Sequence, residues 1–271
     1  MNTYKYFFGS DERSIPFLKT IHKHTSYLKV ITTEPKQKGR GRKVIPNYVE
    51  KYCIENNIIF SYFKDDLTLT DMEFGICASF SKIFSENFIK RNNSIFNIHL
   101  SLLPEFRGPT PVEFTILKKK NIAGYTIFKI DSNIDTGKII KQESFLIDNN
   151  TYASEVYSKI YGLFTMNFTK INFNNEGFNQ GVSSLITKKF VKKEFNLNGL
   201  SLEDAKLKIR AFNTIGPAFI KFNNKIVKIH SYTNYETSEG IQLKDGTLYP
   251  DIVTPEGRKI MKFTDYLRGL K

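Results

Sequence analysis

The sequence predicts an α/β protein in which a large domain with a mostly parallel sheet is followed by a linker and a small β-rich domain. Short apolar runs alternate with helical segments over the first two-thirds of the chain. An Asn- and Gly-rich stretch at 172–181 and a basic stretch at 188–193 then interrupt this pattern. We therefore expect the large domain at residues 1–180, the linker at 181–199 and the small domain at 200–271.

The large domain is expected to alternate strands and helices. Its strands are short runs rich in Ile, Val, Phe and Tyr, residue types that favour a half-buried pleated surface. Pro46 suits the first turn of a helix, and Thr151 is a cap-like residue at the start of another. Strands are expected at 4–8, 28–32, 58–62, 74–78, 95–99, 125–130 and 139–147, and helices at 14–24, 46–56, 81–91, 111–119 and 151–171.

The small domain is expected to begin with a helix at 201–211. Asn223-Asn224 then separates two apolar runs, as in a hairpin with a two-residue turn. Further extended segments are expected at 240–243 and 247–253, which makes this part of the chain β-rich.

Composition narrows the function classes. A content of 40% hydrophobic and 14% aromatic residues excludes a disordered protein. The 40 Lys and Arg residues outnumber the 27 Asp and Glu residues, giving a net charge of +13 that favours an anionic partner such as a nucleic acid or nucleotide. Because no apolar run approaches the roughly 18 residues of a membrane span, we expect no membrane partner and a cytoplasmic location.

Metal chemistry is not expected. The two cysteines, Cys53 and Cys77, cannot form a four-cysteine zinc site, and buried free thiols are favoured over a disulfide. No two of the four histidines are spaced as a helical pair of ligands. A metal-dependent hydrolase is therefore disfavoured, and we predict no metal.

The densest group of chemically useful residues follows the predicted strand at 95–99. Asn97 and His99 alternate along that strand and so share a face, at the carboxyl end where open α/β sheets bind ligands. An amide can donate to a developing oxyanion, and an imidazole can move a proton. On their own, the two residues favour a strand that simply ends in structural hydrogen bonds, and the turn at Pro104 and Arg107-Gly108 directly after them favours a functional site.

Two further segments could complete a site. Asp135 lies in a polar loop between two apolar strands and could orient and charge-stabilise His99, although such loops are often plain turns. Residues 36–43 carry five cations and no acid, which suits phosphate contacts, although most charge runs are solvated surface. The cations of this basic loop are Lys36, Lys38, Arg40, Arg42 and Lys43.

Taken together, these residues resemble a known family. Residues 97–111 read Asn-Ile-His-Leu-Ser-Leu-Leu-Pro-Glu-Phe-Arg-Gly-Pro-Thr-Pro, and Asp135-Thr136-Gly137 follows. This long gapped pattern is similar to the signature of the 10-formyltetrahydrofolate-dependent formyltransferases. Stretches at 7–18, 33–43, 210–213 and 255–261 are similar to the members that formylate methionyl-tRNA, so the resemblance covers nearly the whole chain. It implies a Rossmann-like formyltransferase domain and an OB-like, truncated C-terminal domain.

The resemblance also implies an activity and residue roles. The reaction would transfer a formyl group from the cosubstrate 10-formyltetrahydrofolate to a primary amine, without a metal. Asn97, His99 and Asp135 would be catalytic. The folate wall would comprise Ser101, Leu102, Leu103 and Pro104, and the acceptor would meet Arg40, Arg42, Lys43 and Arg107, although Arg107 could instead hold the loop.

Three functions stay open from the sequence. The basic loop and the charge favour methionyl-tRNA as acceptor. The short C-terminal domain favours an alternative, a sugar N-formyltransferase acting on a dTDP-linked 3- or 4-amino-deoxysugar in surface-polysaccharide synthesis. A non-enzymatic nucleic-acid-binding protein is a third hypothesis, disfavoured because Asn97, His99 and Asp135 are all present. No obligate protein partner is inferred.

Overall fold

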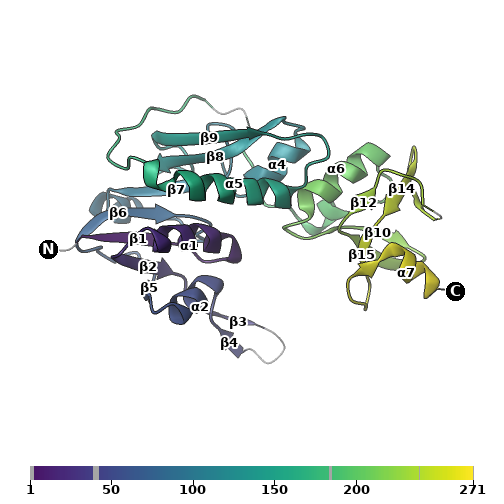
Figure 1. Cartoon of the computed structure of the whole chain (residues 1–271), viewed down its shortest axis with the longest axis horizontal. Helices are drawn as coiled ribbons and strands as arrows, with labels where there is room; N and C mark the ends of the chain where they lie inside the picture. The colour runs from purple at the N-terminus through teal and green to yellow at the C-terminus, as the bar shows by residue number, and fades with distance from the viewer. Residues whose placement is uncertain (1–2, 39–42, 183–184, 238, 271) are drawn as a thin grey trace. The chain divides into compact units, whose positions relative to one another are not determined.

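The largest element of the structure is a seven-stranded sheet with the order β5-β2-β1-β6-β7-β8-β9 (Figure 1). The computed structural model describes residues 3–38, 43–182, 185–237 and 239–270. The strands from β5 to β7 pair in parallel, whereas β8 is antiparallel to β7. The strands are β1 Tyr4–Phe8, β2 Leu28–Thr32, β5 Ile59–Tyr62, β6 Met72–Cys77, β7 Ile95–His99, β8 Ile122–Lys129 and β9 Ile139–Leu146.

Both faces of this sheet are covered, as its apolar strands require. Phe7 and Phe8 are neighbours in β1 and point to opposite faces, yet both are completely buried. On one face lie α1 (Ile15–Lys23) and α5 (Ala153–Asn167), which Figure 1 shows in front of the strands. Phe17 joins these two helices, since its ring lies 5.0 Å from that of Phe164.

Helix starts are set by capping residues. Asn47 accepts hydrogen bonds from the backbone of Val49 and Glu50, so α2 (Tyr48–Glu55) begins after Pro46 and not at it. Ser85 caps α3 (Glu86–Arg91) in the same way, which makes this helix shorter than the predicted 81–91. The ring of Phe88 in α3 stacks on Phe84 and contributes to the core on the second face of the sheet.

The C-terminal region contains two small antiparallel sheets. Asn223 and Asn224 both have positive φ and form the predicted hairpin turn between β10 (Ala218–Phe222) and β11 (Lys225–Ile229). The sheet order β10-β11-β15-β16 is completed by β15 (Ile252–Pro255) and β16 (Met261–Lys262). The second sheet has the order β12-β14-β13, in which the strands are β12 Tyr232–Thr233, β13 Ile241–Gln242 and β14 Thr247–Pro250. Three further helices are α4 Pro111–Leu117, α6 Leu202–Phe212 and α7 Phe263–Arg268. The predicted fold class is confirmed.

The chain forms two compact units, each built from separate stretches of sequence. The first unit comprises residues 1–108, 124–144 and 159–186, and the second comprises 109–123, 145–158 and 187–271. The predicted domain limits, with a linker at 181–199, stay a prediction. In the described part of the chain, no helix combines the length and the apolar character needed to cross a bilayer.

Candidate active site

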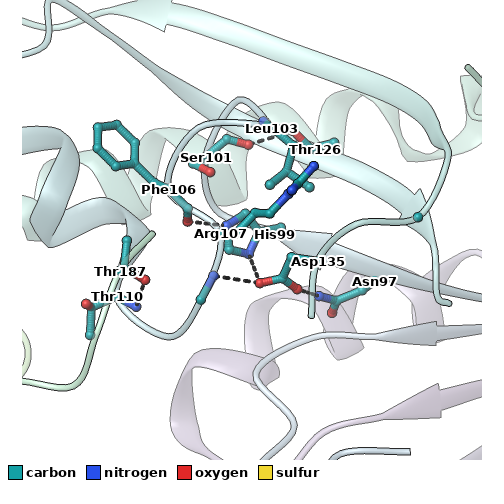
Figure 2. A network of polar contacts seen from close by, with 12 residues as sticks. Asn97, His99, Ser101, Leu103, Phe106, Arg107, Thr110, Thr126, Asp135 and Thr187 are labelled. Carbon is teal, nitrogen blue, oxygen red and sulfur yellow. Dashed lines mark hydrogen bonds and ion pairs between the residues drawn. The ribbon is translucent and has the colours of Figure 1, made fainter. Parts of the chain in front are cut away.

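Asp135 lies between Asn97 and His99 in the first unit, as Figure 2 shows. The amide Nδ2 of Asn97 donates to its Oδ1 at 3.5 Å, and His99 Nδ1 lies 3.5 Å from its Oδ2. The backbone N–H of Gly108 also donates to Oδ2, at 2.8 Å. The structure therefore brings together the three residues predicted to be catalytic, although they lie 38 positions apart at the extremes.

The ring of His99 is held on both sides. Its Nε2 lies 2.8 Å from the carbonyl oxygen of Phe106, which can only accept, so Nε2 carries the hydrogen of this bond. The side chain of His99 is 6% exposed, and that of Asp135 is 13% exposed. Nδ1 is therefore the ring nitrogen placed to exchange a proton with Asp135.

The loop that carries Asp135 is shaped by its own side chains. Asp131 accepts hydrogen bonds from Thr136 Oγ1 at 2.7 Å and from the backbone of Asn133 at 3.2 Å. Asp135 itself has a φ of 55°, in the left-handed region that favours glycine, so its side-chain contacts must offset the backbone strain. Gly137 follows because a Cβ there would lie 1.7 Å from the carbonyl oxygen of Lys129.

Thr126 fixes the loop that follows β7. Its hydroxyl donates to the carbonyl of Ser101 at 2.6 Å and accepts from the backbone of Leu103 at 3.0 Å and from Gln142 Nε2 at 2.9 Å. One donated and two accepted bonds use the full capacity of a hydroxyl. Gln142 also donates to the carbonyl of Leu103. Thr126 and Gln142 position the loop, yet sequence reasoning missed both because the residues that they contact lie far away along the chain.

The four residues of the predicted folate wall are not equally accessible. Ser101 and Leu103 are 2% and 3% exposed, and Leu103 packs with Phe128 and Ile139. Leu102 and Pro104 are half-buried. Only the latter two therefore have surface to offer a ligand, while Ser101 and Leu103 support the loop.

Arg107 forms hydrogen bonds with a segment that lies far away along the chain. Its guanidinium donates through Nε and Nη2 to Gln180 Oε1, at 3.1 and 2.7 Å, and through Nη2 to the carbonyl of Gly181. Gln180 in turn donates from Nε2 to the carbonyls of Asp135 and Gly137, at 3.0 and 2.7 Å. Gln180 thus connects Arg107 to the Asp135 loop. No sequence motif indicated it, and contact of Arg107 with the acceptor stays a prediction.

Residues 36–43, predicted to be a basic loop, overlap two short paired strands. The strands β3 (Lys36–Lys38) and β4 (Lys43–Ile45) pair antiparallel, with Lys38 opposite Lys43. Arg40 and Arg42 lie outside the described residues. The acceptor-binding role of Arg40, Arg42 and Lys43 stays a prediction.

Cys77 is the nearest thiol to this network, in the strand beside β7, where it pairs with Asn97. Burial raises the pKa of the Cys77 thiol, and the negative charge of Asp135 raises this pKa further. The sulfur is therefore held as a neutral thiol and is unsuited to act as a nucleophile. Among the residues that the structure describes, no group of three or more His, Cys, Asp or Glu side chains is placed to hold a metal ion.

A sequence profile described as formyl transferase matches residues 12–163, which is more than half of the chain and includes Asn97, His99 and Asp135. The chain belongs to the formyl transferase family. The predicted family and the expectation of an enzyme of formyl transfer are confirmed.

Relatives of this formyltransferase match it along almost its whole length. A methionyl-tRNA formyltransferase of Wolbachia sp. subsp. Drosophila simulans is 29% identical, and the match covers 98% of this chain and 96% of the relative. A crystal structure of a sugar 3N-formyl transferase, determined with dTDP and 5-N-formyl-THF, is similar with a TM-score of 0.65 and 24% identity, covering 95% of this chain and 99% of the other. The methionyl-tRNA formyltransferase of Clostridium thermocellum has a TM-score of 0.63 and 17% identity, with 96% and 100% covered.

We predict that Gln180→Ala lowers the kcat of this formyltransferase by about tenfold or more, because misplacing a catalytic group by a small distance is costly. The substitution removes both bonds to the Asp135 loop and both bonds from Arg107 to the amide oxygen. Formyl transfer is measured alongside the thermal midpoint, with Asn175→Ala in the preceding exposed segment as control. A folded Gln180→Ala enzyme with the kcat of the control would show that Gln180 has no positioning role.

Proposed function

We propose that the protein transfers the formyl group of 10-formyltetrahydrofolate to the primary amine of methionyl-tRNA. The observation that carries this proposal is the match to a methionyl-tRNA formyltransferase over 98% of this chain and 96% of that one. The net charge of +13 supports it, because transfer RNA is a polyanion whose phosphates attract lysine and arginine.

The Asp135 network supports a mechanism of direct acyl transfer. The neutral amine attacks the formyl carbon, and a C–N bond forms as the carbonyl oxygen becomes an oxyanion. The amide of Asn97, which is half-buried, donates a hydrogen bond to this oxyanion. Asp135 takes the proton that the attacking amine loses, and His99 Nδ1 lies beside it to share the charge. The oxyanion then re-forms the carbonyl as the bond to N10 breaks, and the proton that Asp135 took, which His99 Nδ1 lies close enough to share, passes to N10 as it leaves.

The folate is proposed to lie against the loop after β7. Leu102 and Pro104 carry the half-buried apolar surface of this loop, and Thr126 and Gln142 hold the backbone behind it. An apolar wall next to a few fixed polar groups is the usual construction of a cofactor site. A cytoplasmic location and the lack of an obligate protein partner stay predictions.

A sugar acceptor is the second candidate. It is supported by the solved sugar 3N-formyl transferase, whose TM-score and identity to this chain, 0.65 and 24%, are slightly higher than the 0.63 and 17% of the tRNA enzyme structure. The acceptor would then be a dTDP-linked 3- or 4-amino-deoxysugar. The same Asn97, His99 and Asp135 chemistry serves both amines, so the two candidates differ in acceptor recognition alone.

Matched acceptor assays separate these candidates. Loss of 10-formyltetrahydrofolate is followed with methionyl-tRNA, with dTDP-linked 3- and 4-amino-deoxysugars, and with no acceptor. We expect turnover with methionyl-tRNA, and a kcat/KM whose log–log dependence on salt has a slope of about −2 to −3, as for about three phosphate contacts. Turnover with a sugar alone would replace the tRNA proposal by the sugar candidate.

A further inference from the structure

A pocket of about 230 Å3 lies within the second unit, next to α6 and separate from the Asp135 network. Its walls come from the end of α4, the loop at 147–150, one side of α6 and the strand β12. We call it the α6 pocket. Its volume is far above the roughly 10–15 Å3 that a single water molecule needs, so it has room for a small polar ligand.

Arg210 lines the α6 pocket and is 9% exposed. Its Nη1 donates to the hydroxyl of Tyr232 at 2.7 Å, but its Nε is buried without a hydrogen-bond partner. Among the described residues, no carboxylate forms an ion pair with this guanidinium. A guanidinium is always charged, and a buried charge needs an opposite charge and hydrogen bonds to offset its lost hydration.

The fold itself offsets only part of the free-energy cost of burying the charge of Arg210. Arg210 lies in the last turn of α6, where a cation interacts favourably with the helix dipole. The Tyr232 hydroxyl is a neutral partner and cannot replace a counter-charge. The guanidinium of this pocket-lining residue therefore keeps a buried donor without a partner and a charge without a counter-charge, and an anion in the pocket would supply the counter-charge.

The other charged residues around the pocket leave it positive. The cations Lys119, Lys120 and Lys206 accompany Arg210, against the two acids Asp148 and Glu203. Lys119 is paired with Glu203. Lys206 donates to Asn234 Oδ1 at 3.0 Å, and its ammonium lies 5.2 Å from the centre of the Tyr232 ring, so neither contact neutralises it.

We propose that the α6 pocket binds the terminal phosphate group of a small phosphorylated molecule, with Arg210 and Lys206 as its anion ligands. A terminal phosphate can enter a pocket and present several oxygens to a buried guanidinium fork. A phosphodiester in a nucleic-acid backbone is flanked by sugars on both sides and has fewer free oxygens to present to such a guanidinium. The proposal is independent of the acceptor of the formyl group.

Direct binding tests the proposal with the full chain and without any folate. Inorganic phosphate, thymidine diphosphate and uncharged tRNA are titrated separately by calorimetry, and the thermal midpoint is followed in parallel because a ligand of the folded state raises it. We expect saturable binding of phosphate and tighter binding of the diphosphate. We expect Lys206→Gln and Arg210→Gln to weaken both by about tenfold or more, since each removes a charge-assisted contact.

The control is Lys225→Gln, which removes an equal charge from an exposed position of β11 in the same unit, outside the pocket. Because Arg210→Gln could unfold a buried site, Tyr232→Phe serves as a further variant that keeps the ring and frees the guanidinium. The proposal would be overturned if the wild type bound neither phosphate nor the diphosphate, or if it bound tRNA alone. Equal affinities of Lys206→Gln and Lys225→Gln for these ligands would also overturn it. Formyl transfer, assayed separately, reports on the proposed function alone.

Discussion

Replacing Asp135 with asparagine is expected to lower kcat by about 10²–10⁴-fold, the range typical of a lost general acid or base. Asparagine has nearly the same shape and can still accept the 2.8 Å bond from Gly108. It cannot take the proton of the attacking amine, and it removes the negative charge beside His99 Nδ1. The effect is therefore expected on the chemical step, with little change in the KM for 10-formyltetrahydrofolate.

The matched control is Asp131→Asn, the same change four positions earlier in the same loop. Its amide oxygen can still accept from Thr136 and from the backbone of Asn133, so we expect near-wild-type turnover. Single-turnover rates and circular dichroism separate a chemical defect from a folding defect. If both variants turned over at similar rates, Asp135 would have no role as the base.

Asn97→Ala is expected to lower kcat by about 10²–10³-fold, as removal of one oxyanion donor does in other acyl-transfer enzymes. The side chain is half-buried and ends 3.5 Å from Asp135, so its loss leaves the strand pairing of β7 in place. Loss of a donor that acts only on the developing oxyanion lowers kcat and kcat/KM by the same factor. Thermal unfolding should change little, because the group removed makes a single long hydrogen bond.

Asn93→Ala provides the comparison, since Asn93 is an exposed amide just before the same strand. Its turnover should equal that of the wild type. A folded Asn97→Ala enzyme with kcat within about threefold of the Asn93→Ala variant would exclude an oxyanion role for Asn97.

The sequence predicts those residues of the site that a short local pattern indicates. Asn97 and His99 share a face because strands alternate, and the loop after β7 follows at the carboxyl end of the sheet. Asp135 could be assigned from the resemblance, since it lies in a short motif. The structure places all three within one network of polar contacts, and their catalytic roles stay a prediction.

The supporting residues could not be predicted in this way. Thr126 and Gln142 bind a loop 23 to 39 positions away along the chain, and Gln180 reaches 43 and 45 positions back. No periodicity encodes such pairs. The extended segment predicted at 247–253 is found as two strands, β14 and β15, because the backbone of Asp251 between them donates to the carbonyl of Ser231, a partner that the sequence does not indicate.

Residues 178–182 and 185–186 return to the site, and this return makes the length of the preceding segment a constraint on its evolution. Phe178 exchanges backbone hydrogen bonds with Ile139, and Leu185 accepts one from Phe106, so Phe178 is fixed beside β9 and Leu185 beside the loop after β7. In the segment between α5 and Phe178, the ring of Phe173 stacks on that of Phe74, and Gly177 has a positive φ, whereas residues 174–176 are exposed. The composition of 174–176 can therefore vary more than that of Phe173 or Gly177, whereas adding or deleting a residue would pull Gln180 out of register with Asp135. Variation among descendants of this gene should therefore accumulate there as substitutions and be depleted in insertions and deletions.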